Sequence, residues 1–174
     1  METLPRDVVL KAVEEILTEA YEGPPDPGGT WFVNNAADAG FFPTLDALPA
    51  EDATRAVRAG GSTVAAHAGH MRFSLEVSRR WVSGDRGPYD WHQSWAVHEV
   101  DAAAWAELRA GLRQEYRALR RALDEARDFS QPVFTGVIGA VAHAAYHLGA
   151  VKQMVLELRA ATADEPAVAA ADAG

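Results

Sequence analysis

The stretch from residue 132 to residue 160, PVFTGVIGAVAHAAYHLGAVKQMVLELRA, decides the fold of this chain. When it is wound at about 100° per residue, one broad face contains Gly136, Ala140, Ala150, Val151, Met154 and Leu158. His143 and His147 lie on that face one turn apart, whereas Lys152 and Arg159 lie opposite. The stretch therefore predicts a long helix that directs two imidazoles into a helical core.

Three further stretches show the same helical spacing of apolar residues: 5–21, 62–83 and 101–128. We expect Ser62 and Asp101 to be the N-caps of the second and third long helices, and a short helix to begin at Pro49. The sequence contains no convincing pair of strands. The pattern predicts an all-α four-helix bundle with a long crossover between the first and second helices.

The length of 174 residues favours a single domain, which we place at residues 1–161. Residues 162–174 lack a large apolar side chain, and we expect them to form a disordered C-terminal tail. The chain contains no cysteine, which excludes disulfides, thiolate metal sites and a cysteine nucleophile.

The net charge of −9 disfavours binding to a polyanion such as DNA. The third long helix does carry a basic stripe, formed by Arg109, Arg113, Arg117, Arg120 and Arg121. Acidic residues interleave with this stripe, so we interpret it as a solvated, salt-bridged face. The sequence also lacks a signal-peptide pattern and a long unbroken apolar run. We expect a cytoplasmic protein that binds no nucleic acid and no membrane.

The segment 22–49 has no sustained periodicity and is rich in proline. It also carries the large aromatic residues Trp31, Phe32, Phe41 and Phe42. We expect it to fold back on the bundle with its rings buried. Long ordered loops are often functional, but a segment of this kind can also cap one end of the core, and the sequence leaves both interpretations open.

The histidine pair on the last helix is typical of a metal site, because an i, i+4 pair brings two imidazoles close enough to share one ion. A third ligand is offered by His67 or His70 on the second long helix, and the helical wheel does not choose between them. Three histidines leave positions open for water or substrate. Imidazole suits a divalent ion, with zinc or nickel expected first and iron or manganese after them.

Three segments give the chain its resemblance to the DinB/YfiT-like superfamily of bacterial metal-binding four-helix bundles: STVAAHAGHM at 62–71, DWHQSW at 90–95 and HAAYHLG at 143–149. The resemblance implies a metal triad of His70, His143 and His147, with His67 as a neighbouring, hydrogen-bonded side chain. Members often continue with Gln-Ile after the last glycine of the third segment, whereas this chain has Ala150-Val151.

The resemblance also implies a function and partners. Members are similar to thiol-dependent enzymes, so we expect a metal-dependent transferase, isomerase or hydrolase that acts on a small molecule with a low-molecular-weight thiol such as mycothiol, bacillithiol or glutathione. The alternative is a stress-response protein that binds a metal or small ligand without catalysis. A homodimer is expected from the family, with Trp105 and the small residues of the last helix at its contact.

Four aromatic residues are candidates for the mouth of the pocket: Trp31, Phe32, Trp91 and Trp95. The helical wheel points Tyr146 away from the site, where we expect it to pack. His92 and His98 lie outside the long helices, and we interpret them as surface or loop residues rather than general bases.

Overall fold

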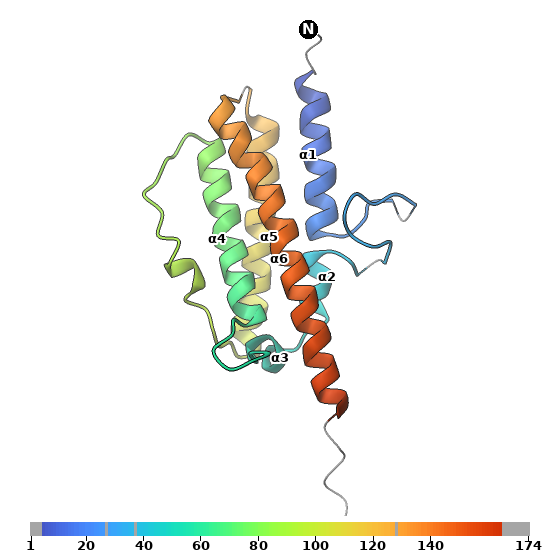
Figure 1. Ribbon diagram of the computed structural model, residues 1–174. Helices are drawn as coiled ribbons and strands as arrows, with labels where there is room; N and C mark the ends of the chain where they lie inside the picture. Colours follow the sequence, from blue (N-terminus) through green and yellow to red (C-terminus); the bar gives the residue numbers. More distant parts are fainter. Residues whose placement is uncertain (1–4, 27, 37, 128, 165–174) are drawn as a thin grey trace, which may run out of the picture.

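The computed structural model describes residues 5–26, 28–36, 38–127 and 129–164, which form an α-helical bundle (Figure 1). Its long helices are α1 (Arg6–Tyr21), α4 (Val64–Val82), α5 (Ala102–Glu125) and α6 (Gln131–Asp164). Three short helices lie in the connections: α2 (Phe41–Asp46), α3 (Ala50–Thr54) and η1 (Gln93–Trp95). The described residues contain no strand, only an isolated bridge between Asp26 and Gly29. The predicted all-α fold class is confirmed.

The helix starts follow from side-chain capping. Asp101 caps α5 as predicted, because its side chain accepts a hydrogen bond of 2.8 Å from the backbone N–H of Ala104. The prediction of Ser62 as the cap of α4 is wrong by one residue. Thr63 holds that place, with its hydroxyl accepting the N–H of Ala66 at 3.1 Å. The same hydroxyl donates to the carbonyl of His98, which joins the start of α4 to a distant part of the chain.

The last helix is longer than its sequence pattern predicts. Helix α6 continues to Asp164, beyond the expected end at residue 160. Residues 165–174, the greater part of the expected tail, lie outside the described residues. Among the described residues, the span 131–162 is long and apolar enough to cross a membrane by length and composition alone, a test that the core helix of a soluble protein also passes. The expectation that no membrane is bound therefore stays a prediction.

The directions of the helices follow from their contacts (Figure 1). Helix α1 begins where α5 ends, since the Arg6 side chain donates to the carbonyl of Leu123 at 3.1 Å. Helices α4 and α5 run parallel, because Arg79 pairs with Glu115 while Gly111 lies against Arg72. Helix α6 runs antiparallel to both. The bundle thus pairs two helices that run one way with two that run the other.

Two long connections complete this topology. The first connection (residues 22–63) is long, as expected, but it leads to α4, which is antiparallel to α1. The second connection (residues 83–101) returns along the bundle from the end of α4 to the start of α5, and it is the one that joins two parallel helices (Figure 1). A connection of this kind must cover one side of the bundle.

The rings of the first connection divide between the core and the surface. Phe41 and Phe42 are buried as expected, and Phe42 packs against Tyr116 of α5 at a ring-centre distance of 5.3 Å. Trp31 and Phe32 are 73% and 41% exposed, so the expectation that all four rings are buried is wrong for these two.

A buried carboxylate explains the exposure of those two rings. The side chain of Glu19 in α1 is fully buried, and its oxygens accept the backbone N–H groups of Trp31, Phe32 and Val33 at 2.8–2.9 Å. The segment is therefore fixed to the bundle by its backbone rather than by these side chains, which leaves the rings of Trp31 and Phe32 outside.

The basic stripe on α5 is partly paired with acids from other elements. Arg109 and Arg113 both form ion pairs with Asp46 at the end of α2. Arg120 pairs with Glu14 and Glu22 at 3.8 and 3.4 Å. These pairs agree with the interpretation of a salt-bridged face, although the expected absence of a nucleic-acid partner stays a prediction.

Candidate metal centre

The antiparallel packing of α4 against α6 brings three predicted side chains together. His70 of α4 lies opposite His143 and His147 of α6, and one ring nitrogen from each lies within 4.8 Å of the others. His70 and His147 are buried, and His143 is half-buried. We call this group the three-histidine cluster. The structure thus brings together all of the residues expected to form the metal triad.

The same nitrogen atom of each ring points to the centre of the cluster. The Nε2 atom of His143 lies 3.1 Å from Nε2 of His70 and 2.9 Å from Nε2 of His147. Imidazole nitrogens bind zinc at about 2.0–2.1 Å, so ligands at about a right angle around one ion are roughly 3 Å apart. The His143 nitrogen therefore already lies at about this spacing from each of the other two donors.

The opposite nitrogen of each ring has its own partner. Nδ1 of His70 lies 2.7 Å from Oγ of Ser94, and Nδ1 of His143 lies 2.9 Å from Oγ of Ser74. Nδ1 of His147 lies 2.9 Å from Nδ1 of His67. Partners of this kind fix the ring orientation and the tautomer of metal-binding histidines.

The Ser94 contact assigns a proton. Ser94 donates its hydroxyl hydrogen to the carbonyl of Trp91 at 2.6 Å, so its oxygen accepts from His70. Nδ1 of His70 therefore carries the hydrogen and its Nε2 is left as a free lone pair. The arrangement around His143 and His147 permits the same tautomer, which is the form that binds a metal ion.

The electrostatics of the cluster favour neutral rings. Burial, together with the neighbouring His143 and His67, lowers the pKa of His70 to about 4. Burial likewise lowers the pKa of His147 to about 3, again with help from the surrounding histidines. The pKa of His143 is also lowered by burial. Imidazole must be unprotonated to bind a metal, so these side chains are ready as ligands near neutral pH.

His67 lies behind the cluster rather than in it. It is buried, it contacts His147 through the nitrogen that points away from the centre, and its ring meets Trp95 edge-on at 5.2 Å. This geometry agrees with its interpretation as a hydrogen-bonded neighbour. Trp95 also stacks on His70 with a ring-centre distance of 4.1 Å, so it holds the orientation of that imidazole.

Two serines of the site were missed by the sequence analysis. Ser74 follows His70 by one helical turn, a spacing that was available as a signal. Ser94 lies in the second connection, inside the segment DWHQSW that had been singled out for its aromatic residues. No local pattern indicates which of its polar groups reaches the cluster, since Ser94 and His70 are 24 residues apart.

A cavity of about 510 Å³ opens beside the cluster. His70, Ser74 and His143 lie at one end of it. Its other walls are mainly apolar and come from α4, α6 and the second connection: Val77, Ser78, Trp81, Val82, Arg86, Tyr89, Trp91, Val133, Gly136, Val137, Gly139 and Ala140. We call it the apolar cavity. Its position gives a small molecule access to the cluster.

Of the aromatic residues expected at the mouth, only Trp91 lines the apolar cavity, while Trp95 packs on the histidines. The expectation for Trp31 and Phe32 is wrong, because the first connection lies elsewhere and Phe32 lines a separate pocket. Tyr146 points outward as expected and is 71% exposed, so only its edge-on contact with the His147 ring fits the expected packing.

His92 and His98 are exposed residues of the second connection. This placement agrees with their interpretation as surface or loop side chains. Neither lines the apolar cavity, whose only histidines are His70 and His143.

Comparison with known proteins gives one match. A family model described as the DinB superfamily matches residues 36–151, about two thirds of the chain. The matched span begins before α2 and includes every member of the three-histidine cluster. No curated protein and no solved structure matches the chain.

Proposed function

The chain belongs to the DinB superfamily, and from this premise we propose that it is a metal-dependent enzyme whose ion is held by His70, His143 and His147. The observation that carries the proposal is the convergence of three Nε2 atoms, each on a ring whose Nδ1 has a partner. Zinc and nickel are the ions proposed first, with iron and manganese as alternatives. A divalent ion held by three imidazoles supplies a Lewis acid with open positions, which lowers the pKa of a water molecule or a thiol.

The reaction that we propose is a thiol-dependent group transfer or isomerisation, or else a hydrolysis. Two cluster members, His70 and His143, line the apolar cavity, so a bound molecule can reach the proposed ion. No carboxylate lines this cavity among the described residues. The chain has no cysteine, so a thiol must come from solution. The proposed partners are a small-molecule substrate and a low-molecular-weight thiol, as the family likeness favours.

Elemental analysis of purified variants tests the metal centre. We expect about one equivalent of metal in the wild-type protein and a loss of it in His70→Ala and His143→Ala. His92→Ala is the matched control, because His92 is exposed and does not line the apolar cavity. Equal metal content in all four proteins would overturn the proposed site.

Turnover distinguishes the enzyme from the alternative, a non-catalytic protein that binds a metal or small ligand. A panel of thiols with electrophilic small molecules, assayed on the metal-loaded protein, should show turnover that His143→Ala abolishes. The absence of a carboxylate among the described residues that line the apolar cavity favours the alternative, since such a site offers no obvious general base. Stoichiometric metal and ligand-dependent stabilisation without turnover would support the non-catalytic function.

A cytoplasmic homodimer is part of the proposal. Ile138, Tyr146 and Leu156 of α6 are exposed apolar or aromatic side chains on the helix expected to carry the contact. Trp105, the other expected contact residue, instead lies in the core at 2% exposure and donates to the carbonyl of Leu48. Mass measurement in solution tests the dimer, and Tyr146→Glu should shift it to a monomer.

A further inference from the structure

The shape of the apolar cavity restricts what it can bind. It follows α4 from His70 to Trp81, and a helix rises by about 1.5 Å per residue, so these positions are roughly 16 Å apart along the axis. Between them the walls are valines and small residues, including Val77, Val133 and Val137. An elongated apolar molecule fits such a cavity, because its body would be removed from water along its length.

The end of the cavity far from the cluster carries its one formal charge. Among the described residues that line the cavity, Arg86 is the only Lys, Arg, Asp or Glu. In a chain with a net charge of −9, this is a local positive site beside an apolar surface.

The Arg86 side chain is held in place but retains free donors. Its guanidinium carbon lies 4.7 Å from the ring centre of Trp81, and Nη1 donates to the carbonyls of Trp81 and Asp85 at 2.6 and 3.1 Å. Within the described part of the chain, its Nε and Nη2 atoms donate no hydrogen bond. These donors form the fork that recognises an acidic group.

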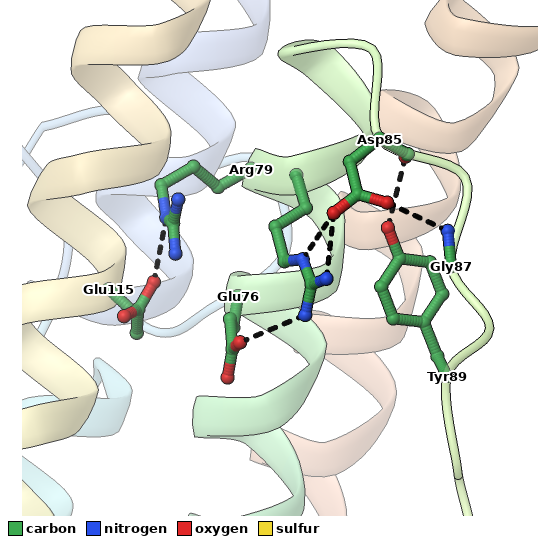
Figure 2. Close-up of polar contacts among 7 residues, drawn as sticks. Glu76, Arg79, Asp85, Gly87, Tyr89 and Glu115 are labelled. Atoms are coloured by element: carbon green, nitrogen blue, oxygen red, sulfur yellow. Dashed lines mark hydrogen bonds and ion pairs between the residues drawn. The ribbon is translucent and has the colours of Figure 1, made fainter.

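The neighbouring acid does not neutralise Arg86, because it is engaged elsewhere (Figure 2). The Asp85 carboxylate pairs with Arg80 at 2.7 Å and accepts the N–H of Gly87 at 2.9 Å. Tyr89 donates its hydroxyl to the carbonyl of Asp85 at 3.0 Å. The N–H of Gly87 and the Arg80 guanidinium hold the pKa of Asp85 below its usual value, so it stays paired with Arg80. The turn that presents Arg86 is thereby fixed.

We propose that the apolar cavity binds an elongated apolar acid, with its acidic group at Arg86 and its other end at the three-histidine cluster. The reactive role of the cluster end rests on the proposed function, whereas binding at Arg86 needs no metal. The apolar body supplies the driving force through burial, and the guanidinium selects the acidic group and the direction of binding.

Isothermal titration calorimetry with decanoate tests the proposal on chelated protein, with decanol and decylamine as probes of the same chain length. We expect decanoate to bind most tightly and Arg86→Leu to weaken it about tenfold or more, since a charge-assisted contact is lost. The weaker binding of decanol should not change in Arg86→Leu. Arg121→Leu is the matched control, because Arg121 is exposed on α5 outside the cavity. Equal affinity for decanoate and decanol, or no effect of Arg86→Leu, would overturn the proposal.

A second variant tests the location of the ligand. A Cβ atom added at Gly136 would lie 3.8 Å from Trp81, an ordinary contact, so Gly136→Leu should extend into the cavity and retain the fold. Leucine is also a better helix former than glycine. We expect this variant to keep the circular dichroism of the wild type and to lose decanoate binding. Unchanged binding in the folded variant would place the ligand elsewhere and contradict the proposal.

The two proposals fail in different ways. Metal analysis of the same preparations reports on the cluster, whereas the titrations use chelated protein. Decanoate binding that depends on Arg86, in a protein without metal affinity, would refute the proposed function and support the cavity proposal. Stoichiometric metal without Arg86-dependent binding would refute the cavity proposal alone.

Discussion

The first connection (residues 22–63) and the second connection (residues 83–101) are both long and both carry several aromatic residues, but they contact different parts of the bundle. In the first, Phe41 and Phe42 enter the core, and Trp31 lies outside. In the second, Trp91 lines the apolar cavity and Trp95 stacks on His70. The aromatic content of a connection therefore does not show whether that connection supports the fold or the site. The residues that each ring contacts show this instead.

The polar contacts show the same division. The first connection is fixed by the buried Glu19, which accepts three backbone N–H groups. The second connection offers Ser94 to His70. We expect changes to the first connection to reduce the stability of the fold without affecting metal binding. Changes to the second connection should weaken metal binding and leave the stability of the fold nearly unchanged.

The largest effect is expected from Glu19→Ala. The substitution leaves the N–H groups of Trp31, Phe32 and Val33 without their acceptor and opens a cavity in the core. We expect a loss of about 3 kcal/mol or more in the free energy of unfolding, measured with urea. Glu15→Ala on the same helix is the control. A folded Glu19→Ala protein should retain its metal. Loss of metal without loss of stability would show that the first connection supports the metal centre, and it would contradict the division between the two connections.

Ser94→Ala is the matching change in the second connection. It removes the acceptor that orients His70 and fixes its tautomer. Loss of such a partner typically weakens metal binding by about 10–100-fold, and we expect an effect of this size on metal affinity in a competition titration. Stability of the chelated protein should change little. Ser83→Ala, exposed at the start of the same connection, should leave the affinity unchanged.

His67 extends this test to a partner that comes from a helix. His67→Leu removes the contact with Nδ1 of His147, so we expect metal affinity to fall about tenfold. His67→Gln, which retains a hydrogen-bonding group, should restore part of it. Complete loss of metal in both variants would identify His67 as a ligand and contradict its placement behind the cluster.

The sequence predicted the parts of this structure that depend on local periodicity. The long helices, the cap at Asp101 and the inward direction of His143 and His147 all follow from residue spacing. The choice of His70 over His67 did not follow from the helical wheel, because both fall on the wide apolar face of α4. It came from the family resemblance, and the structure adds a geometric reason for it.

The parts that the sequence did not predict are contacts between distant residues. Glu19 reads as one more polar position of an amphipathic helix, yet it is fully buried and holds the first connection. Ser94 reaches His70 only because the second connection returns along the bundle. Helical periodicity does not specify the direction in which a helix runs, so it could not show which connection covers the site.

Acid should destabilise the chelated protein through the cluster. The pKa of His70 is about 4 and that of His147 about 3 in the folded protein, against an ordinary value of 6.5. Below about pH 6.5 these histidines become protonated in the unfolded chain but stay neutral in the folded protein. Their contribution to the free energy of unfolding is therefore fully present above that pH and decreases as the pH falls below it. We expect the melting temperature to drop by a few degrees between about pH 7 and pH 5. The drop should be smaller in His147→Gln, and an equal drop would place the acid sensitivity outside the cluster.

The smallest effect is expected from Trp31→Ala. This substitution tests whether the first connection takes part in ligand binding, as its aromatic content would indicate from sequence alone. A tryptophan in a long, proline-rich loop is a natural candidate for a ligand-binding residue, but this side chain is 73% exposed. Its backbone N–H, which the substitution retains, makes the contact with Glu19. We therefore expect a change of less than about 0.5 kcal/mol in the free energy of unfolding and unchanged affinity for metal and decanoate.

Trp91→Ala, which removes a wall of the apolar cavity, should weaken decanoate binding under the same conditions. If Trp31→Ala weakened decanoate binding as much as Trp91→Ala, the first connection would also reach the ligand, and the division between the two connections would not hold.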